Sequence, residues 1–330
     1  MNSVIREAFD AVRGGRHASA VLEDVFRAEQ PDATRAASLR AELFGAIRAA
    51  GMPTWLHARL HDALGERAQV LVDALMHDAS TYVRVNTLQS TAQATTTALT
   101  SHQPSACDLE HALRIGQPFG LFRTDAFRDG WFEQQDIASQ RVVFDLDIRP
   151  GMRVVDACAG AGGKTLQVAA LMQNRGRIVA IDVVERKLDE LRRRAQRAGV
   201  TIAETRHAVS TKTVKRLAGT ADRVLIDAPC SGTGVLRRNP DIMLHLTEPM
   251  LDELITIQGG ILRRSAMAAK PGGRVVYATC SLLRSESEDQ VQSFLQAHDD
   301  FTLVAEHRTM PDTVAEDGMY WAVMERSGNV

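Results

Sequence analysis

The feature that most constrains this sequence is a regular alternation of strand-like and helix-like segments after Pro150-Gly151. Short β-branched runs predict strands, and the stretches between them have the apolar spacing of amphipathic helices. We expect strands at about 152–157, 177–182, 201–206, 222–227 and 273–279, and helices at about 163–173, 184–198, 211–218, 248–269 and 284–297. This alternation favours an α/β fold with a mostly parallel sheet and helices on both faces, in which ligands bind at the carboxyl ends of the strands.

Two further segments precede the sheet. Residues 1–79 are rich in Ala, Leu and Arg with helical spacing, which predicts a short all-helical N-terminal domain of about four helices. Residues 80–135 contain two strand-like runs, at about 82–87 and 120–127, with a helical stretch between them. They predict a small α+β connecting module. A helix at about 133–147 then leads from this module into the sheet domain, which covers residues 136–330.

Composition narrows the class of protein only slightly. The formal net charge is −2, which provides no overall basic footprint for nucleic acid, but a basic stretch from Arg175 to Arg216 is either a nucleic-acid surface or a solvated helix face. No apolar run approaches the ~20 residues needed to cross a bilayer, and no secretory signal pattern occurs. The four cysteines lie about 50 to 70 residues apart, without a C-x-x-C pair or adjacent histidines. We therefore expect a cytoplasmic protein with free thiols and no metal site.

A glycine-rich turn follows the first strand of the sheet domain. The strand ends at Asp156, and the turn consists of Cys158, Ala159, Gly160, Ala161, Gly162, Gly163 and Lys164. It departs from the P-loop because Cys158 replaces the first glycine, and from the dinucleotide loop because Thr165 replaces the third. The methyl-donor loop of class I S-adenosylmethionine methyltransferases fits this turn. Asp182 ends the second strand, where a carboxylate can accept hydrogen bonds from both ribose hydroxyls or cap the next helix.

Two cysteines occur at the ends of two strands. Cys230 follows Asp227-Ala-Pro after the fourth strand, and Cys280 follows Thr279 after the fifth. One buried cysteine is usually structural, but two at matching strand ends predict a reactive pair across one cleft. A thiolate that adds to C6 of a pyrimidine activates C5 for methylation, and a second group must then assist loss of the C5 proton. The residues alone do not determine which thiol attacks.

These residues resemble the Sun/Nop (RsmB-like) family of RNA cytosine-5 methyltransferases over roughly residues 80–325. The resembling stretches are Asp156–Lys164, Asp227–Gly234 with Arg237–Asp241, Tyr277–Ser281 with Glu286–Val291, Arg84–Thr87 and Gly130–Gln140. The resemblance implies a class I, Rossmann-like methyltransferase domain. It also implies transfer of a methyl group from S-adenosylmethionine to C5 of an unpaired cytosine in RNA, with ribosomal RNA favoured over transfer RNA.

Specific roles are implied by position within the family pattern. Residues 158–164 hold the methyl donor, Asp182 its ribose, and Asp227 the region between adenosine and target base. Cys280 is the nucleophile and Cys230 assists release of the product. Arg237 and Arg238 follow the Pro-Cys turn, where an RNA backbone must pass to deliver a base, so we expect them to contact phosphate. The N-terminal helices could bind RNA or dock on the next domain, and a monomer is expected.

Three features depart from the family pattern. Ala161 stands where proline is common, and no acid follows the third strand, which leaves His207 or a backbone amide to contact the adenine. The helical segment is also shorter than the NusB-like RNA-binding domain of full-length RsmB-like enzymes. The alternative function is a catalytically weak RNA- or S-adenosylmethionine-binding assembly factor, and a nicotinamide or nucleoside-triphosphate enzyme is a third possibility that depends on the glycines alone.

Overall fold

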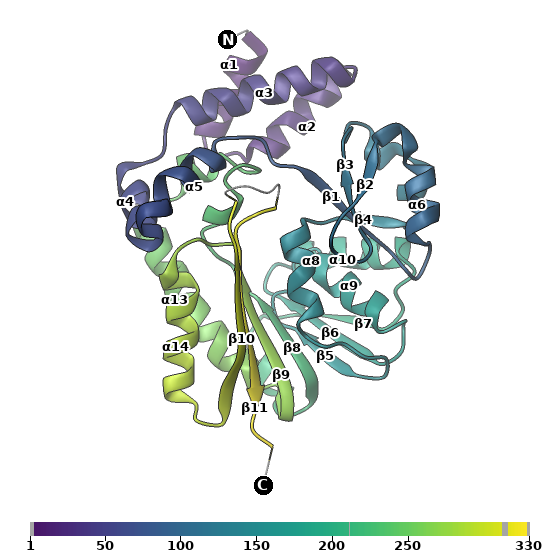
Figure 1. Cartoon of the computed structure of the whole chain (residues 1–330), viewed down its shortest axis with the longest axis vertical. Helices are drawn as coiled ribbons and strands as arrows, with labels where there is room; N and C mark the ends of the chain where they lie inside the picture. The colour runs from purple at the N-terminus through teal and green to yellow at the C-terminus, as the bar shows by residue number, and fades with distance from the viewer. Residues whose placement is uncertain (1–2, 211, 312–315, 329–330) are drawn as a thin grey trace.

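A seven-stranded sheet forms the centre of the molecule (Figure 1). The computed structural model describes residues 3–210, 212–311 and 316–328. From one edge to the other, the strands are β10 (Phe301–Thr309), β11 (Met319–Arg326), β9 (Ala269–Thr279), β8 (Ala221–Asp227), β5 (Arg153–Asp156), β6 (Arg177–Asp182) and β7 (Ala203–His207). Strands β5 to β9 are parallel to one another, and β11 runs antiparallel between β9 and β10. The predicted mostly parallel sheet is confirmed.

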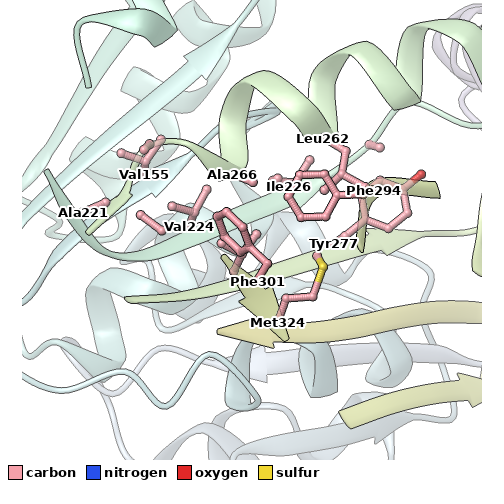
Figure 2. Packing of buried hydrophobic residues seen from close by; sticks show 14 of the residues in the cluster. Val155, Ala221, Val224, Ile226, Leu262, Ala266, Tyr277, Phe294, Phe301 and Met324 are labelled. Atoms are coloured by element: carbon pink, nitrogen blue, oxygen red, sulfur yellow. The ribbon is translucent and has the colours of Figure 1, made fainter. Parts of the chain in front are cut away.

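Helices cover both faces of this sheet (Figure 1). On one face, α13 (Glu248–Ala266) and α14 (Glu288–Ala297) bury Leu262 and Phe294 against Val224 and Tyr277 of the strands (Figure 2). On the other face lie α8 (Ile137–Phe144), α9 (Gly163–Leu171) and α10 (Glu185–Arg197). Burial of these aliphatic faces is the main stabilising term for the sheet, because burying each such side chain contributes about 1.5–3 kcal/mol.

The order in which strands are added to the sheet reverses at β5. From β5 the chain continues outward through β6 and β7, and it then returns to β8 on the opposite side of β5. Crevices at such a switch point lie outside the carboxyl ends of the strands and are the usual ligand sites of α/β sheets. The carboxyl ends of β5, β6, β8 and β9 therefore define where a functional site is expected.

Several sequence-based boundaries need correction. Strands β10 and β11 were not expected; β10 exposes most of its side chains at the edge of the sheet, so its pattern lacks an apolar face. The helix expected at about 211–218 is the short α11 (Lys212–Lys215), and residue 211 lies outside the described residues. The helix expected from about 284 begins only at Glu288, after a 3₁₀ turn at Arg284–Glu286.

The segment from 80 to 135 forms a second, antiparallel sheet. Its strand order is β2 (Pro104–Ala106), β3 (Ala112–Ile115), β1 (Thr81–Val85) and β4 (Phe132–Gln134), and α6 (Ala92–Ala98) follows β1 along the chain. The strand expected from Gly120 to Phe127 is wrong. Gly120 has a φ of +76°, and the Thr124 side chain accepts a hydrogen bond from the Phe127 amide, which begins the short helix α7 (Asp125–Arg128). Helix capping therefore prevails over the strand-like alternation.

Five α-helices occupy the described residues before β1, compared with the four expected. Helices α1 (Ser3–Arg13), α2 (Ala18–Glu29) and α3 (Ala33–Ala49) enclose a core of their own. Helices α4 (Thr54–Leu64) and α5 (Ala68–Leu75) instead bury Leu56 and Leu75 with Leu236 and Leu282 of the sheet domain. Within the described residues, no helix combines the length and apolar character needed to span a membrane.

Candidate active site

A cavity of about 790 Å³ opens at the carboxyl ends of β5, β6, β8 and β9. Its lining includes almost every residue predicted from the sequence to hold a donor or perform chemistry, namely Cys158, Ala159, Gly160, Ala161, Gly163, Lys164, Asp182, Asp227, Cys230 and Cys280. Residues more than 120 positions apart in the chain thus face one space, as the parallel sheet predicted. The volume is within the usual range of small-molecule sites.

The glycine-rich turn between β5 and α9 is shaped by two left-handed residues. Gly160 has a φ of +53° and Gly162 a φ of +91°. A side chain at Gly162 would place its Cβ atom 2.7 Å from Leu191 of α10, whereas Cβ atoms at Gly160 and Gly163 would meet nothing within 4 Å. Gly162 is therefore needed for close packing of α10, and the space beside Gly160 and Gly163 leaves room for a ligand to approach the backbone.

Asp182 secures this turn from the end of β6. One carboxylate oxygen accepts a hydrogen bond from the Gly160 amide at 2.8 Å, and the other accepts from the Val184 amide at 2.8 Å. The residue that caps α10 is Val184, so Asp182 is not the helix cap considered as an alternative. Each carboxylate oxygen has a second lone pair, so Asp182 can still accept hydrogen bonds from a ligand in the cavity that it lines.

Two charged side chains that line the cavity form an ion pair. Lys164 Nζ lies 2.7 Å from Asp227 Oδ2, which joins the glycine-rich turn to the end of β8. Nearby, the Thr165 hydroxyl donates to Asp156 at 2.6 Å. Burial raises the pKa of Asp156 to about 7, and the neighbouring carboxylate of Asp227 adds to this effect.

The two predicted thiols lie side by side. Cys230 Sγ and Cys280 Sγ are 3.1 Å apart, and both cysteines are free. The hydrogen bond to Cys280, together with burial, raises the pKa of Cys230 well above its ordinary value. Cys230 therefore remains a protonated thiol that can donate to Cys280. Burial likewise raises the pKa of Cys158, the third thiol of the cavity, which disfavours its thiolate form.

A buried glutamate holds the two cysteine turns together, a role that sequence reasoning missed. The Glu286 carboxylate is fully buried and accepts hydrogen bonds from the Ser231 amide, the Ser231 and Ser281 hydroxyls and Gln258 Nε2. The Thr233 hydroxyl adds a further link by accepting from the Leu282 amide at 2.9 Å. Ser231 and Ser281 each follow one of the cysteines, so Glu286 positions both thiols. The only sequence signal was its place in a stretch that resembles the family.

The antiparallel module contacts the glycine-rich turn directly. Buried Arg84 of β1 donates to the Gln135 side chain at 2.8 Å and to the Gly163 carbonyl at 3.4 Å. Buried Glu133 of β4 pairs with Arg194 of α10, and Arg194 also donates to the Ala161 carbonyl at 2.9 Å. The module therefore supports the glycine-rich turn. Arg194 belongs to the basic stretch noted in the sequence, so at least this arginine is used for an ion pair within the protein.

Arg237 and Arg238, predicted to contact phosphate, are engaged within the protein. The Arg237 side chain is only 6% exposed and pairs with Asp317 at 3.4 Å. Arg238 pairs with Asp136 at 2.6 Å and with Asp317 at 2.5 Å. This arrangement disfavours Arg237 as a phosphate ligand. Arg238 remains 21% exposed and lines a second cavity of about 370 Å³, which it shares with Cys280, Lys164 and Asp227.

The end of β7 lacks an acid, as the sequence indicated. The His207 ring is directed at Val183 and Glu185: Nε2 lies 2.9 Å from the Val183 carbonyl oxygen and Nδ1 lies 3.3 Å from the Glu185 carboxylate, and His207 itself does not line the cavity. Ala208 and Ser210 line the cavity at this point instead. A contact between His207 and a ligand in the cavity is therefore not supported by its position.

Comparison with known proteins places these observations in a family. Residues 143–324 match the family described as 16S rRNA methyltransferase RsmB/F, and residues 52–121 match the ferredoxin-like domain of RsmF/B-like methyltransferases. Ribosomal RNA small subunit methyltransferase B of Pectobacterium carotovorum is 32% identical over 83% of this chain and 66% of its own. The chain thus spans slightly less than two thirds of the length of that relative.

Solved structures agree with this placement. A methyltransferase homolog protein from Pyrococcus horikoshii superposes with a TM-score of 0.74 and 26% identity, over 86% of this chain and 98% of its own. A protein named PH0851 has a TM-score of 0.80 and 26% identity, over 93% and 76% of the two chains. With its Rossmann-like sheet and strand-end cavity, the chain belongs to the RsmB/F family of 16S rRNA methyltransferases.

Proposed function

We propose that this chain transfers a methyl group from S-adenosylmethionine to C5 of an unpaired cytosine in ribosomal RNA. The observation that carries the proposal is the pair of free thiols, Cys230 and Cys280, 3.1 Å apart on the wall of a cavity formed by a glycine-rich turn. The RNA class follows from the names of the RsmB/F family and of its relatives. A ribosomal RNA substrate would be met in the cytoplasm, which is the proposed location. The chain is further proposed to act as a monomer.

The residues at the strand ends fit the methyl donor. The open space at Gly160 and Gly163 lets a ligand approach the backbone at the N-terminus of α9, where a carboxylate is favoured. Asp182 has lone pairs available for ribose hydroxyls, and the cavity of about 790 Å³ is large enough for a nucleoside with its side chain. When bound, S-adenosylmethionine supplies an electrophilic methyl group.

The two thiols differ in the way the proposed chemistry requires. Cys280 acts as the nucleophile: its thiolate adds to C6 of the cytosine and makes C5 nucleophilic. Cys230 stays protonated, because its pKa is raised, and its S–H can stabilise the neighbouring thiolate. After C5 has gained the methyl group, the C5 proton passes to solvent water, the C5–C6 double bond re-forms and the C6–S bond breaks; Cys280 leaves as a thiolate, and Cys230 assists by donating its S–H hydrogen bond to that thiolate.

Lys164 and Asp227 are proposed to face the target base. Both line the donor cavity and the second cavity that contains Cys280. The ammonium group of Lys164 is a donor and the carboxylate of Asp227 an acceptor, which matches the O2 and N4 groups on the polar edge of cytosine. A base reaches this position only when it leaves its stack, which favours unpaired RNA.

A denaturing-gel assay for a covalent protein–RNA adduct tests the proposal. The full chain is incubated with 16S rRNA or transfer RNA and S-adenosylmethionine, as wild type, Cys230→Ala, Cys280→Ala and the double variant. We expect the adduct to accumulate in Cys230→Ala with 16S rRNA and to disappear in the double variant. Cys107→Ala is the matched control, because Cys107 lies in the antiparallel module near Leu109, away from the strand ends.

Other results would change the proposal in defined ways. An adduct that requires Cys230 would reverse the roles of the thiols, and an adduct with transfer RNA alone would change the substrate. If S-adenosylmethionine binds but no variant forms an adduct, and both cysteine variants keep their cellular role, the chain is instead an RNA- or donor-binding assembly factor.

A further inference from the structure

A cluster of two histidines and one aspartate lies far from the thiols, where the N-terminal helices meet the sheet domain. His17 precedes α2, whereas Asp241 and His245 belong to the segment of α12 (Ile242–His245) that follows Arg237 and Arg238. One ligand atom of each residue lies within 4.8 Å of the others. We propose that this cluster binds a divalent transition metal ion of the zinc type; the inference is independent of the proposed function.

The position of His245 determines which of its nitrogens is available. His245 Nε2 lies 2.7 Å from the Val12 carbonyl oxygen, which can only accept, so Nε2 carries the proton. In the neutral ring, Nδ1 therefore has a free lone pair, and it faces Asp241 Oδ2 at 3.9 Å. Metal-ligating histidines typically donate one ring N–H to a backbone carbonyl or carboxylate, as His245 does to Val12, and keep the other nitrogen for the metal.

Asp241 supplies the buried negative charge. Its side chain is 4% exposed, and the one hydrogen bond found for its carboxylate within the described residues is with His17 Nδ1 at 3.2 Å. Arginine and lysine do not pair with this carboxylate in that part of the chain. A buried carboxylate requires a cation or several donors, and two neutral imidazoles supply at most one donor here.

The donor set and spacing match a three-ligand site. Two imidazole nitrogens and one carboxylate oxygen suit zinc, with a water in the fourth tetrahedral position. The two rings are 6.2 Å apart at their centroids and at 76° to each other, and one nitrogen of each lies within 4.8 Å of the other and of an Asp241 oxygen. The His17 side chain is 81% exposed, which leaves an entry path for the ion.

A metal here would join distant parts of the chain. His17 and Val12 belong to the corner between α1 and α2, and Leu244 of α12 packs against the core of the α1–α3 helices. The ion would therefore hold these helices to the segment that follows Arg238, a residue that lines the cavity beside Cys280. Removing the ion should loosen this junction without changing the strand-end cavity.

Titration of Zn²⁺ into the metal-free full chain by calorimetry tests the site. We expect one equivalent to bind to the wild type, and we expect the Kd to rise at least about tenfold in His17→Ala and in Asp241→Asn. His17 is exposed, so its removal does not endanger folding, and thermal melts check both variants. Zn²⁺ should raise the melting temperature of the wild type but not of His17→Ala, and Co²⁺ should give the visible absorption of a tetrahedral site only in the wild type.

His61→Ala is the control, because His57 and His61 lie one turn apart on α4 with their rings 6.5 Å apart and could bind metal themselves. Wild-type affinity in His17→Ala, loss of binding in His61→Ala, or the absence of any binding to the wild type would each overturn the proposal.

Discussion

The strand-end site and the α1–α3 helices are built in opposite ways. At the site, buried polar groups from three parts of the chain hold one another: Glu286 accepts four hydrogen bonds, and Lys164 reaches across to Asp227. The α1–α3 helices instead enclose apolar side chains of their own, such as Leu39 and Leu43. A polar site depends on the direction of each bond, whereas an apolar core depends on volume. Changes in the first region should therefore affect function at nearly constant fold, and changes in the second should affect local stability.

The sharpest test of this contrast is Cys280→Ala. We expect methyl transfer to 16S rRNA to fall by at least about 10³-fold, the scale seen when a catalytic nucleophile is removed. The melting temperature should change little, because the thiol is only partly buried. Incorporation of labelled methyl groups measures the activity. Cys107→Ala is the control and should keep wild-type activity; a Cys280→Ala variant that retains a tenth of the activity would contradict the assignment of the nucleophile.

Leu43→Ala should have the opposite profile. Leu43 is fully buried in the α1–α3 core, and removal of such a side chain costs about 3 kcal/mol in the free energy of unfolding. Donor binding should remain at the wild-type level, because the donor cavity contains no residue of these helices. Denaturant unfolding and a donor-binding titration measure the two effects. Leu303→Ala, at a 45% exposed position, is the matched control; weaker donor binding in Leu43→Ala would show that the two regions are coupled.

The pH dependence of stability should originate at the site. The pKa of Asp156 is raised from 3.8 to about 7 in the folded protein, so the folded state binds a proton that the unfolded state has lost. Stability is therefore highest below pH 4 for this group and falls as the pH rises to 7, by about 2–3 kcal/mol between pH 5 and 7. Asp156→Asn should remove this part of the slope in chemical denaturation curves. An unchanged slope in Asp156→Asn would assign the effect to other carboxyl groups, such as Asp317.

Glu286→Gln should change both stability and activity, each to a moderate degree. The amide keeps the shape of the side chain but replaces charged hydrogen bonds by neutral ones, which should cost about 2 kcal/mol. The thiols would be held less precisely, and small displacements of reacting groups can lower the rate about 10²-fold. Paired stability and activity measurements test this expectation. Glu248→Gln, which loses an exposed ion pair with Arg59 outside the network, should leave activity unchanged; equal effects of both variants would argue against a positioning role for Glu286.

Much of the fold could be predicted because local patterns specify it. The β-branched runs and the helical spacing after Pro150 predict that strands β5 to β9 alternate with helices along the chain. Because these strands are parallel, their carboxyl ends lie at one edge of the sheet, together with the residues that follow them: Cys158, Asp182, Asp227, Cys230 and Cys280. Strand β10 was missed because an edge strand exposes most of its side chains and lacks an apolar face. The strand predicted from Gly120 to Phe127 is wrong because the alternation of apolar and polar residues there is also compatible with a turn followed by a helix. The hydrogen bond from the Phe127 amide to the Thr124 hydroxyl, which caps that helix, exists only in the folded structure.

The sequence by itself therefore determined the parallel strands of the sheet, the strand-end residues and the family resemblance, since each depends on residues close together along the chain. Only the tertiary structure decided which polar groups meet. It brought the sulfur atoms of Cys230 and Cys280 together across 50 residues and His17 to Asp241 across 224, and it enclosed Arg237 in an ion pair where phosphate contact was expected. The reason is physical: side-chain partners are selected by packing and desolvation in the folded core, and neither leaves a periodic mark on the sequence.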